Sequence, residues 1–349
     1  EVIEYSDRIV VFRGGRNVAE FDPKVTPIEL IADAAFPPDR TDEYGRPEAK
    51  DTAEAKTALA TRARAKKWNR ALGNEVALSA TVLALIVMLY VTSIGFSLLS
   101  VAAAASTWVL LSLAATCVIL VGGIDISIGS MLALSAAVAA MILKLPGPSW
   151  LTIPTAVLAA MLTGVLTGCT NAWVSLVGRV HPIVVTLGTM TIYRGIVITM
   201  LGRNALSGLP REFGYLSIHP ESGFRFGVLM AGLVVVACHV WLSRTPSGRS
   251  LYAVGSNPIA AQMAGISKER TWLLAFGVAG ALVGLAGALQ LASSGRMQGQ
   301  LAQGWELVAI AAAVIGGVSI SGGRGTVLGV VLGAVLLRLT NSVLVHWGV

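Results

Sequence analysis

Gly122-Gly123-Ile124-Asp125-Ile126-Ser127-Ile128-Gly129-Ser130 interrupts a stretch of almost wholly apolar sequence that runs from Leu98 to Leu143. A lipid bilayer favours such a stretch, because about 20 apolar residues span its hydrocarbon core as a helix. An acidic residue inside it is costly, and a broken helix is tolerated only where it faces protein or a water-filled path. The sequence therefore predicts a polytopic membrane protein whose spans line a route for a solute.

The charge of the chain is unevenly distributed. Of the 349 residues 54% are hydrophobic and 13% are charged, whereas soluble domains carry about 25% charged residues. Residues 1–75 are nearly neutral and rich in both signs, and residues 76–349 carry almost all of the net charge of +7. This pattern predicts a water-soluble head before a membrane domain. The basic excess fits cytoplasmic loops, and without a basic, aromatic-rich face no nucleic-acid partner is expected.

The first 70 residues divide into two parts. Residues 1–36 are expected to form a short α/β segment, with strands at 8–12 and 17–21 around a Gly-Gly turn and a helix capped by Thr26. So short a piece cannot build its own core, so it is interpreted as the end of a larger domain. Residues 37–70 read as a charged cytoplasmic linker.

Residues 71–349 are predicted to be an all-α transmembrane domain of about nine to ten helices, some of them broken, with the last span expected to be missing. The apolar segments are 76–93, 98–121, 126–143, 150–176, 182–201, 224–243, 271–292, 303–320 and 325–345. Counted from a cytoplasmic start, the basic loop 244–270 falls on the cytoplasmic side, as the positive-inside rule requires.

A similar glycine-rich motif occurs in the second half of the chain. Gly316–Gly323 repeats the glycines and one serine of Gly122–Gly129 at an offset of 194 residues. Internal repeats around a midplane site are typical of transporters, and coincidence between two glycine-rich segments is the alternative. The span count places both motifs on one side, so an inverted repeat would require a re-entrant segment.

The long cytoplasmic loop contains a short helix with signals at both ends. Asn257 is the expected cap, Pro258 the first residue and Gly265 the end. Ala260, Ala261 and Ala264 give it a small-residue face, and Gly255 precedes it. Such a helix suits a groove on a soluble partner, although a simple connector is the alternative.

Few other residues suggest chemistry. Thr186, Gly188 and Thr189, in the segment from Pro182 to Gly195, either line a polar path or pack helices. The charges nearest to spans are Asp125, Arg194, Glu306 and Arg338; for Asp125 a structural role as a cap is favoured over proton relay. No GxxxxGK[ST] motif and no metal-ligand cluster occurs in the sequence, so neither ATP hydrolysis nor a metal site is expected in this chain.

Four motifs together resemble the permeases of bacterial ABC importers for simple sugars, of the ribose, xylose and arabinose type. They are GGIDISIGS at 122–130, PIVVTLGTMTIYRG at 182–195, YAVGSNPIAAQMAGI at 252–266 and GGVSISGGRGTVLG at 316–329. Residues 1–36 resemble the C-terminal end of the same system's ATPase. That departure from separate polypeptides implies either a fused ATPase cut short here or a misplaced gene start.

The resemblance implies a multi-pass protein of the bacterial cytoplasmic membrane, with its N-terminal segment in the cytoplasm, that imports a monosaccharide. A periplasmic sugar-binding protein would deliver the solute, a second permease copy would enclose the path, and ATPase domains holding ATP and Mg²⁺ would supply the energy. The short helix would be the coupling helix, with Gly255, Asn257, Pro258, Ala260, Ala261, Ala264 and Gly265 as its residues. The expected translocation-core residues are Gly122, Gly123, Asp125, Ser127, Gly129, Thr186, Gly188, Thr189, Gly316, Gly317, Ser319 and Ser321.

Two other classes of function remain open at this point. An ion-coupled secondary transporter would need buried carboxylates on several spans, whereas Asp125 is nearly alone here. A non-transporting membrane scaffold would not need a docking helix. An importer permease needs no catalytic residues, and neither do these two alternatives. The chain itself is therefore not expected to be an enzyme.

Overall fold

The computed structural model describes residues 9–13, 16–21, 75–88, 98–202, 205–217 and 226–346. The chain divides into two units, Glu1–Ala71 and Leu72–Val349, each of which is described by itself. In the first unit, strands β1 (Ile9–Arg13) and β2 (Arg16–Phe21) pair antiparallel, with Ile9 opposite Phe21. The helix expected after Thr26 and the linker 37–70 lie outside the described residues, so the α/β character of 1–36 stays a prediction.

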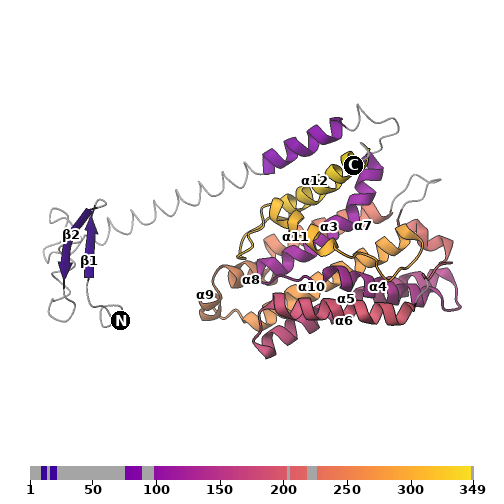
Figure 1. Cartoon of the computed structure of the whole chain (residues 1–349), viewed down its shortest axis with the longest axis horizontal. Coiled ribbons are helices and arrows are strands. Elements are labelled where there is room, and N and C mark those ends of the chain that lie inside the picture. The colour runs from indigo at the N-terminus through magenta and orange to yellow at the C-terminus, as the bar shows by residue number, and fades with distance from the viewer. Residues whose placement is uncertain are drawn as a thin grey trace. The chain divides into compact units, whose positions relative to one another are not determined.

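The second unit is a bundle of helices (Figure 1). Each apolar segment of the sequence corresponds to a helix in it. The helices are 75–88, α3 (Leu98–Leu120), α4 (Ile128–Leu143), α5 (Ser149–Gly178), α6 (Pro182–Leu201), α7 (Phe226–Arg244), α8 (Pro246–Ser256), α9 (Pro258–Met263), α10 (Lys268–Ser294), α11 (Trp305–Ile315) and α12 (Val327–His346), with the 3₁₀ helix η3 (Arg211–Leu216) before α7.

Six helices of the described residues are long and apolar enough to cross a membrane: α3, α5, α6, α7, α10 and α12. Helix 75–88, α4 and α11 are apolar but shorter. Eleven residues of α-helix cover only about 16 Å of a hydrocarbon core of about 30 Å, so α11 cannot span alone. The segment 303–320 is therefore not a simple span, and the expected nine to ten complete spans are not established.

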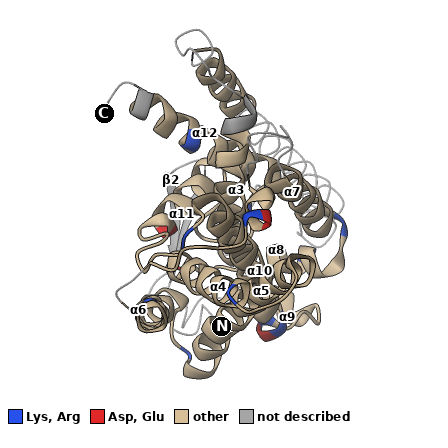
Figure 2. Ribbon diagram, turned by 90° about the vertical axis from the view of Figure 1, so that its right-hand side faces the viewer, with Lys and Arg blue, Asp and Glu red and all other residues tan. Residues whose placement is uncertain are grey.

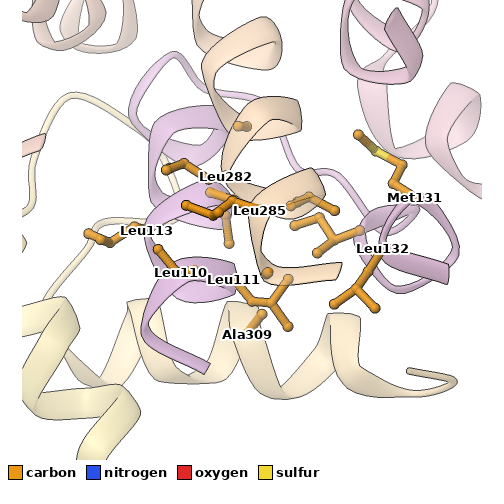
Figure 3. Close-up of a cluster of buried hydrophobic side chains, with 14 of the residues drawn as sticks. Leu110, Leu111, Leu113, Met131, Leu132, Leu282, Leu285 and Ala309 are labelled. Carbon is orange, nitrogen blue, oxygen red and sulfur yellow. The ribbon is translucent and has the colours of Figure 1, made fainter. Parts of the chain in front are cut away.

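Helices α3 and α10 form the centre of the bundle. In the most apolar stretch of each helix, 83% of the residues of α3 and 78% of those of α10 are buried, compared with 22% in α6 and in α7. The central side chains interdigitate in one cluster: Leu110, Leu111 and Leu113 of α3, Met131 and Leu132 of α4, Leu282 and Leu285 of α10, and Ala309 of α11 (Figure 3). Because lipid is as apolar as leucine, close packing rather than escape from water holds this core together.

Helices α5 and α10 approach each other through glycines. A Cβ placed on Gly164 would overlap the carbonyl of Gly280, and a Cβ on Gly280 would overlap the carbonyl of Gly164. Gly168 and Gly284 lie equally close to the backbone of the other helix. The two helices thus face each other with one small-xxx-small pattern each, which is a typical way to bring membrane helices into backbone contact.

The outward surface of the bundle is apolar. Leu158, Leu162 and Leu166 follow one face of α5 and are exposed by 59%, 61% and 68%. Figure 2 shows Lys, Arg, Asp and Glu at few positions along the helices of this unit. An exposed apolar surface of this kind matches a lipid environment.

Candidate functional site

The break between α3 and α4 contains a buried polar network. Asp125 Oδ1 accepts hydrogen bonds from the backbone N of Ser127 at 2.8 Å and from its Oγ at 2.6 Å. Asn171, in α5, donates from Nδ2 to Asp125 Oδ2 at 3.2 Å and to Ser127 Oγ at 2.8 Å. Asp125 is 3% exposed, and Ser127 and Asn171 are completely buried. The carboxylate thus holds the non-helical backbone at the start of α4, which is the structural arrangement that the sequence favours.

The network extends to α6. The single proton of the Tyr193 hydroxyl has two acceptors within reach, Asn171 Oδ1 and the carbonyl of Thr167, each at 3.1 Å. Thr186 Oγ1 accepts from the backbone N of Ile126 at 3.2 Å. Side chains from α5 and α6 therefore fix the broken segment from two sides, and the polar groups satisfy one another inside an apolar bundle.

Sequence reasoning missed Asn171 and Tyr193. Asn171 is a lone amide side chain within an apolar span of 30 residues, and polar residues inside membrane helices usually face the bundle interior. That signal was available in the sequence. The pairing of Asn171 with Asp125, which is 46 residues away, could not be read from the sequence.

The two glycine motifs end their helices in the same way. After α3, Gly122 N donates to Ile119 O at 2.9 Å and Gly123 N to Val118 O at 3.0 Å. After α11, Gly317 N donates to Val314 O at 2.9 Å and Val318 N to Ala313 O at 3.0 Å. Both are Schellman caps with a left-handed glycine, since φ is +82° at Gly122 and +91° at Gly317.

This correspondence corrects the sequence alignment of the two motifs by one residue. Gly122 corresponds to Gly317 rather than to Gly316, and Asp125 therefore corresponds to Ile320. Gly316 instead serves close packing, because a Cβ there would overlap the carbonyl of Gly329 in α12. The shared feature of the repeat is thus the helix end, and the acid belongs only to the first copy.

Both glycine motifs meet at the end of α8. The backbone N of Gly323 donates to the carbonyl of Leu120 at 2.9 Å, which joins the second motif to the end of α3. A Cβ on Gly255, in the last turn of α8, would overlap that same Leu120 carbonyl and approach Gly323 N to 2.7 Å. Gly255 therefore requires its missing side chain because three backbone segments converge there. Ser256 Oγ also donates to Gly323 O at 3.3 Å.

A tyrosine strengthens this junction. The hydroxyl of Tyr252, one turn before Gly255, donates to the carbonyl of Gly325 at 3.2 Å. Burial raises the pKa of Tyr252 to about 12, so the hydroxyl keeps its proton at physiological pH and remains a donor. Displacement of α8 would therefore pull directly on the second glycine motif.

Helix α9 directly follows this junction and has the expected cap. Asn257 Oδ1 accepts from Ile259 N at 3.1 Å and from Ala260 N at 3.0 Å, and Pro258 is the first helical residue. The helix ends at Met263, two residues before Gly265, whose φ is +80°. Local sequence signals thus predict the geometry of this helix correctly.

The expected small-residue face of α9 does not lie outward as a unit. Ala261 is 4% exposed and belongs to the core, whereas Ala260 and Ala264 are exposed. The large apolar side chains exposed on α9 are Ile259 at 72% and Met263 at 86%. The sequence argument chose alanines because of their spacing, but burial of Ala261 against the bundle turns the longer side chains outward.

The remaining predicted residues lie in different places. Thr189 donates to the carbonyl of Thr186 at 3.4 Å, beside the network. Gly188 is exposed and nothing lies within 4 Å of a Cβ there, so it does not join the network. The hydroxyls of Ser319 and Ser321 bond each other at 2.9 Å in an exposed turn. Gly129, at the start of α4, packs against the Glu306 side chain of α11.

An arginine holds the segment between α10 and α11. Arg194, in α6, donates from Nη1 to the carbonyl of Gly299 at 2.9 Å and to that of Leu301 at 2.8 Å. The segment 295–304 between α10 and α11 is irregular, with backbone hydrogen bonds only in isolated turns. The guanidinium satisfies two of the carbonyls that this irregular segment exposes. Its partners lie more than 100 residues away in sequence, so the sequence does not reveal them.

Metal chemistry finds no support in the described residues, where no group of three or more His, Cys, Asp or Glu side chains could hold an ion. Cys117 and Cys238 are buried and Cys169 is partly buried, all as free thiols.

Comparison with known proteins agrees with this architecture. Residues 97–348 match the family described as "Branched-chain amino acid transport system / permease component". The autoinducer 2 import system permease protein LsrC of Escherichia coli O9:H4 (strain HS) is 36% identical over 257 residues, which are 71% of this chain and 72% of that protein. LsrC of Enterobacter sp. (strain 638) is 38% identical over 238 residues, 68% of each chain. No solved structure matches the chain.

The family expected from the four motifs is thereby confirmed. Those motifs at 122–130, 182–195, 252–266 and 316–329 all lie within the matched residues. They also supply the contacts of Thr186 with the backbone of Ile124 and Ile126 and the glycine junction of the structure. The chain belongs to this family of transport-system permeases and is a multi-pass membrane component of a transporter rather than an enzyme.

Proposed function

We propose that this chain is the permease of an ATP-driven importer that carries a monosaccharide or similar sugar-like solute, autoinducer-2 included, into the cytoplasm. The observation that carries the proposal is the glycine junction. Helix α9 exposes Ile259 and Met263, and the turn directly before it contacts the end of α3 and the second glycine motif. A soluble ATPase bound to α9 would thereby move the glycine motifs after α3 and after α11 together, as alternating access requires.

The partners follow from the same proposal. An ATPase subunit or domain binds ATP and Mg²⁺ and docks on α9, a periplasmic binding protein delivers the solute, and a second permease copy encloses the path. Basic residues in loop 244–270 favour the cytoplasmic side for α9. Residues 1–36 are proposed to belong to the ATPase, which places the N-terminal segment on the same side of the inner membrane.

Transport in proteoliposomes tests this function. The complete complex, supplied with its binding protein, is expected to accumulate autoinducer-2 or a pentose only when ATP and Mg²⁺ are present on the cytoplasmic side. A thermal-shift screen of the binding protein against pentoses, hexoses, autoinducer-2 and nucleosides selects the solute beforehand. Uptake that continues without ATP and follows an imposed ion gradient would show a secondary transporter, and absence of any uptake would favour a scaffold.

Met263→Glu is expected to weaken docking of the ATPase on α9 and thereby to lower uptake. Loss of an exposed apolar anchor and addition of a charge cost about 1–2 kcal/mol at an interface, so uptake should fall by about tenfold or more. ATPase stimulation by the loaded binding protein should fall in parallel. The residue is a cleaner choice than Ala261, because a glutamate at the buried Ala261 would also disturb the bundle.

The matched control for that substitution is Gln262→Glu, which adds the same charge on the same helix at an exposed polar position. It should keep uptake within about twofold. Equal loss in both variants would indicate a general charge effect, and normal uptake in Met263→Glu would contradict docking through this face.

A further inference from the structure

A cavity of about 290 Å³ lies between α3, α11 and α12, and it shares no lining residue with the polar network around Asp125. Its walls include Trp108 of α3, Val308 and Ala312 of α11, and Arg338 and Asn341 of α12. Ligand pockets for small molecules begin at about 300 Å³ and combine apolar walls with a few polar groups. This volume and lining therefore suit a solute of the size of a sugar.

Arg338 is the unusual group in this cavity. Its Nη1 donates to Asn341 Oδ1 at 2.9 Å on the same helix, and its Nε is buried without a partner. Within the described part of the chain, no carboxylate lies at ion-pair distance from it. A guanidinium carries five N–H donors, so much of its capacity is unused. Such a charge in a membrane span is costly unless an acceptor compensates it.

The other walls supply an apolar face and a second polar edge. The ring of Trp108 lies 4.6 Å from that of Trp305, centroid to centroid, with 34° between the planes. Thr340 also lines the cavity, and its hydroxyl donates to the carbonyl of Leu336 at 2.9 Å, which leaves its oxygen able to accept. Aromatic surface beside donors and acceptors complements a molecule with an apolar face and a hydroxylated edge.

We propose that this cavity is a binding site for the transported solute and that Arg338 donates hydrogen bonds to oxygen atoms of that solute. The inference rests on the proposed function, that of a solute permease. A sugar brings only hydroxyl and ether oxygens, which accept from Arg338 and exchange hydrogen bonds with Thr340 and Asn341.

The test compares uptake of autoinducer-2 and D-ribose by the complete complex in proteoliposomes, supplied with its binding protein. Wild type is expected to import at least one of the two probes. Arg338→Met should lower uptake of the imported sugar by at least about tenfold, the usual loss when a charged hydrogen-bond donor is removed. ATPase stimulation by the loaded binding protein should persist, because that signal passes through α9.

Three further measurements separate binding from structure. Arg338→Met should not lower the unfolding temperature, since it removes an uncompensated charge, and Arg338→Lys should recover part of the uptake. Arg211→Met, at an exposed arginine of η3, is the matched control and should import normally. If wild type imports a sugar and Arg338→Met imports it equally well, the cavity proposal fails while the proposed function stands.

Other outcomes are equally decisive. Dissociation of the two permease copies in Arg338→Met, or a lowered unfolding temperature, would show that the cavity is a subunit interface or a packing site. Absence of uptake of every probe by wild type would overturn the proposed function, and the cavity proposal with it.

Discussion

Gly280→Leu is expected to abolish the folded permease. A leucine there would force its Cβ into the carbonyl of Gly164, and three further carbons have no space between α5 and α10. Backbone cannot yield as a flexible side chain can, so the two helices would have to separate along their full contact. Overpacking of this kind costs about 1–3 kcal/mol where neighbours adjust, and more where they cannot. The purified protein should aggregate in detergent, as seen by size-exclusion chromatography.

The control for that variant is Gly232→Leu, in α7. Nothing lies within 4 Å of a Cβ at Gly232, so the added side chain meets open space. This variant should elute as the wild type does and unfold within a few degrees of it. A well-folded Gly280→Leu would show that α5 and α10 are not in backbone contact.

Asn171→Leu is expected to be the most destabilising substitution in the polar network. It removes donors from Asp125 and Ser127 and an acceptor from Tyr193, all inside the bundle. Leaving buried hydrogen-bonding groups without a partner costs about 1–3 kcal/mol for each group. Thermal unfolding in detergent should show a correspondingly lower midpoint, and uptake should be lost because the start of α4 is no longer fixed.

Two companion variants identify the cause. Thr170→Val, next to Asn171, removes a hydroxyl that bonds only the carbonyl of Leu166 on an exposed face, so it should leave stability nearly unchanged. The double variant Asn171→Leu with Asp125→Leu should lose less stability than the sum of the two single variants, because both substitutions disrupt the same hydrogen-bond network. If Asn171→Leu unfolds like the wild type, the network is not a structural element.

The positions of the helices were largely predictable from sequence. Each of the apolar segments corresponds to a helix, and the caps of α9 follow from Asn257 and Pro258. Hydropathy and capping are local properties, which explains this success. The number of complete spans was not predictable in the same way, because an apolar run such as 303–320 looks alike whether it spans or breaks, and only the structure shows that α11 ends at Ile315.

The sequence by itself determined the membrane class, the family through its four motifs, and the glycine breaks that end α3 and α11. Tertiary structure decided which faces meet: Asn171 with Asp125, Arg194 with residues 299–301, and Gly255 with both breaks. The physical reason is that these helices are apolar on every side, since lipid and protein interior select the same residues. The spacing of apolar residues therefore does not show which face of a helix points inward. Contacts between residues far apart in sequence are seen only in the folded structure.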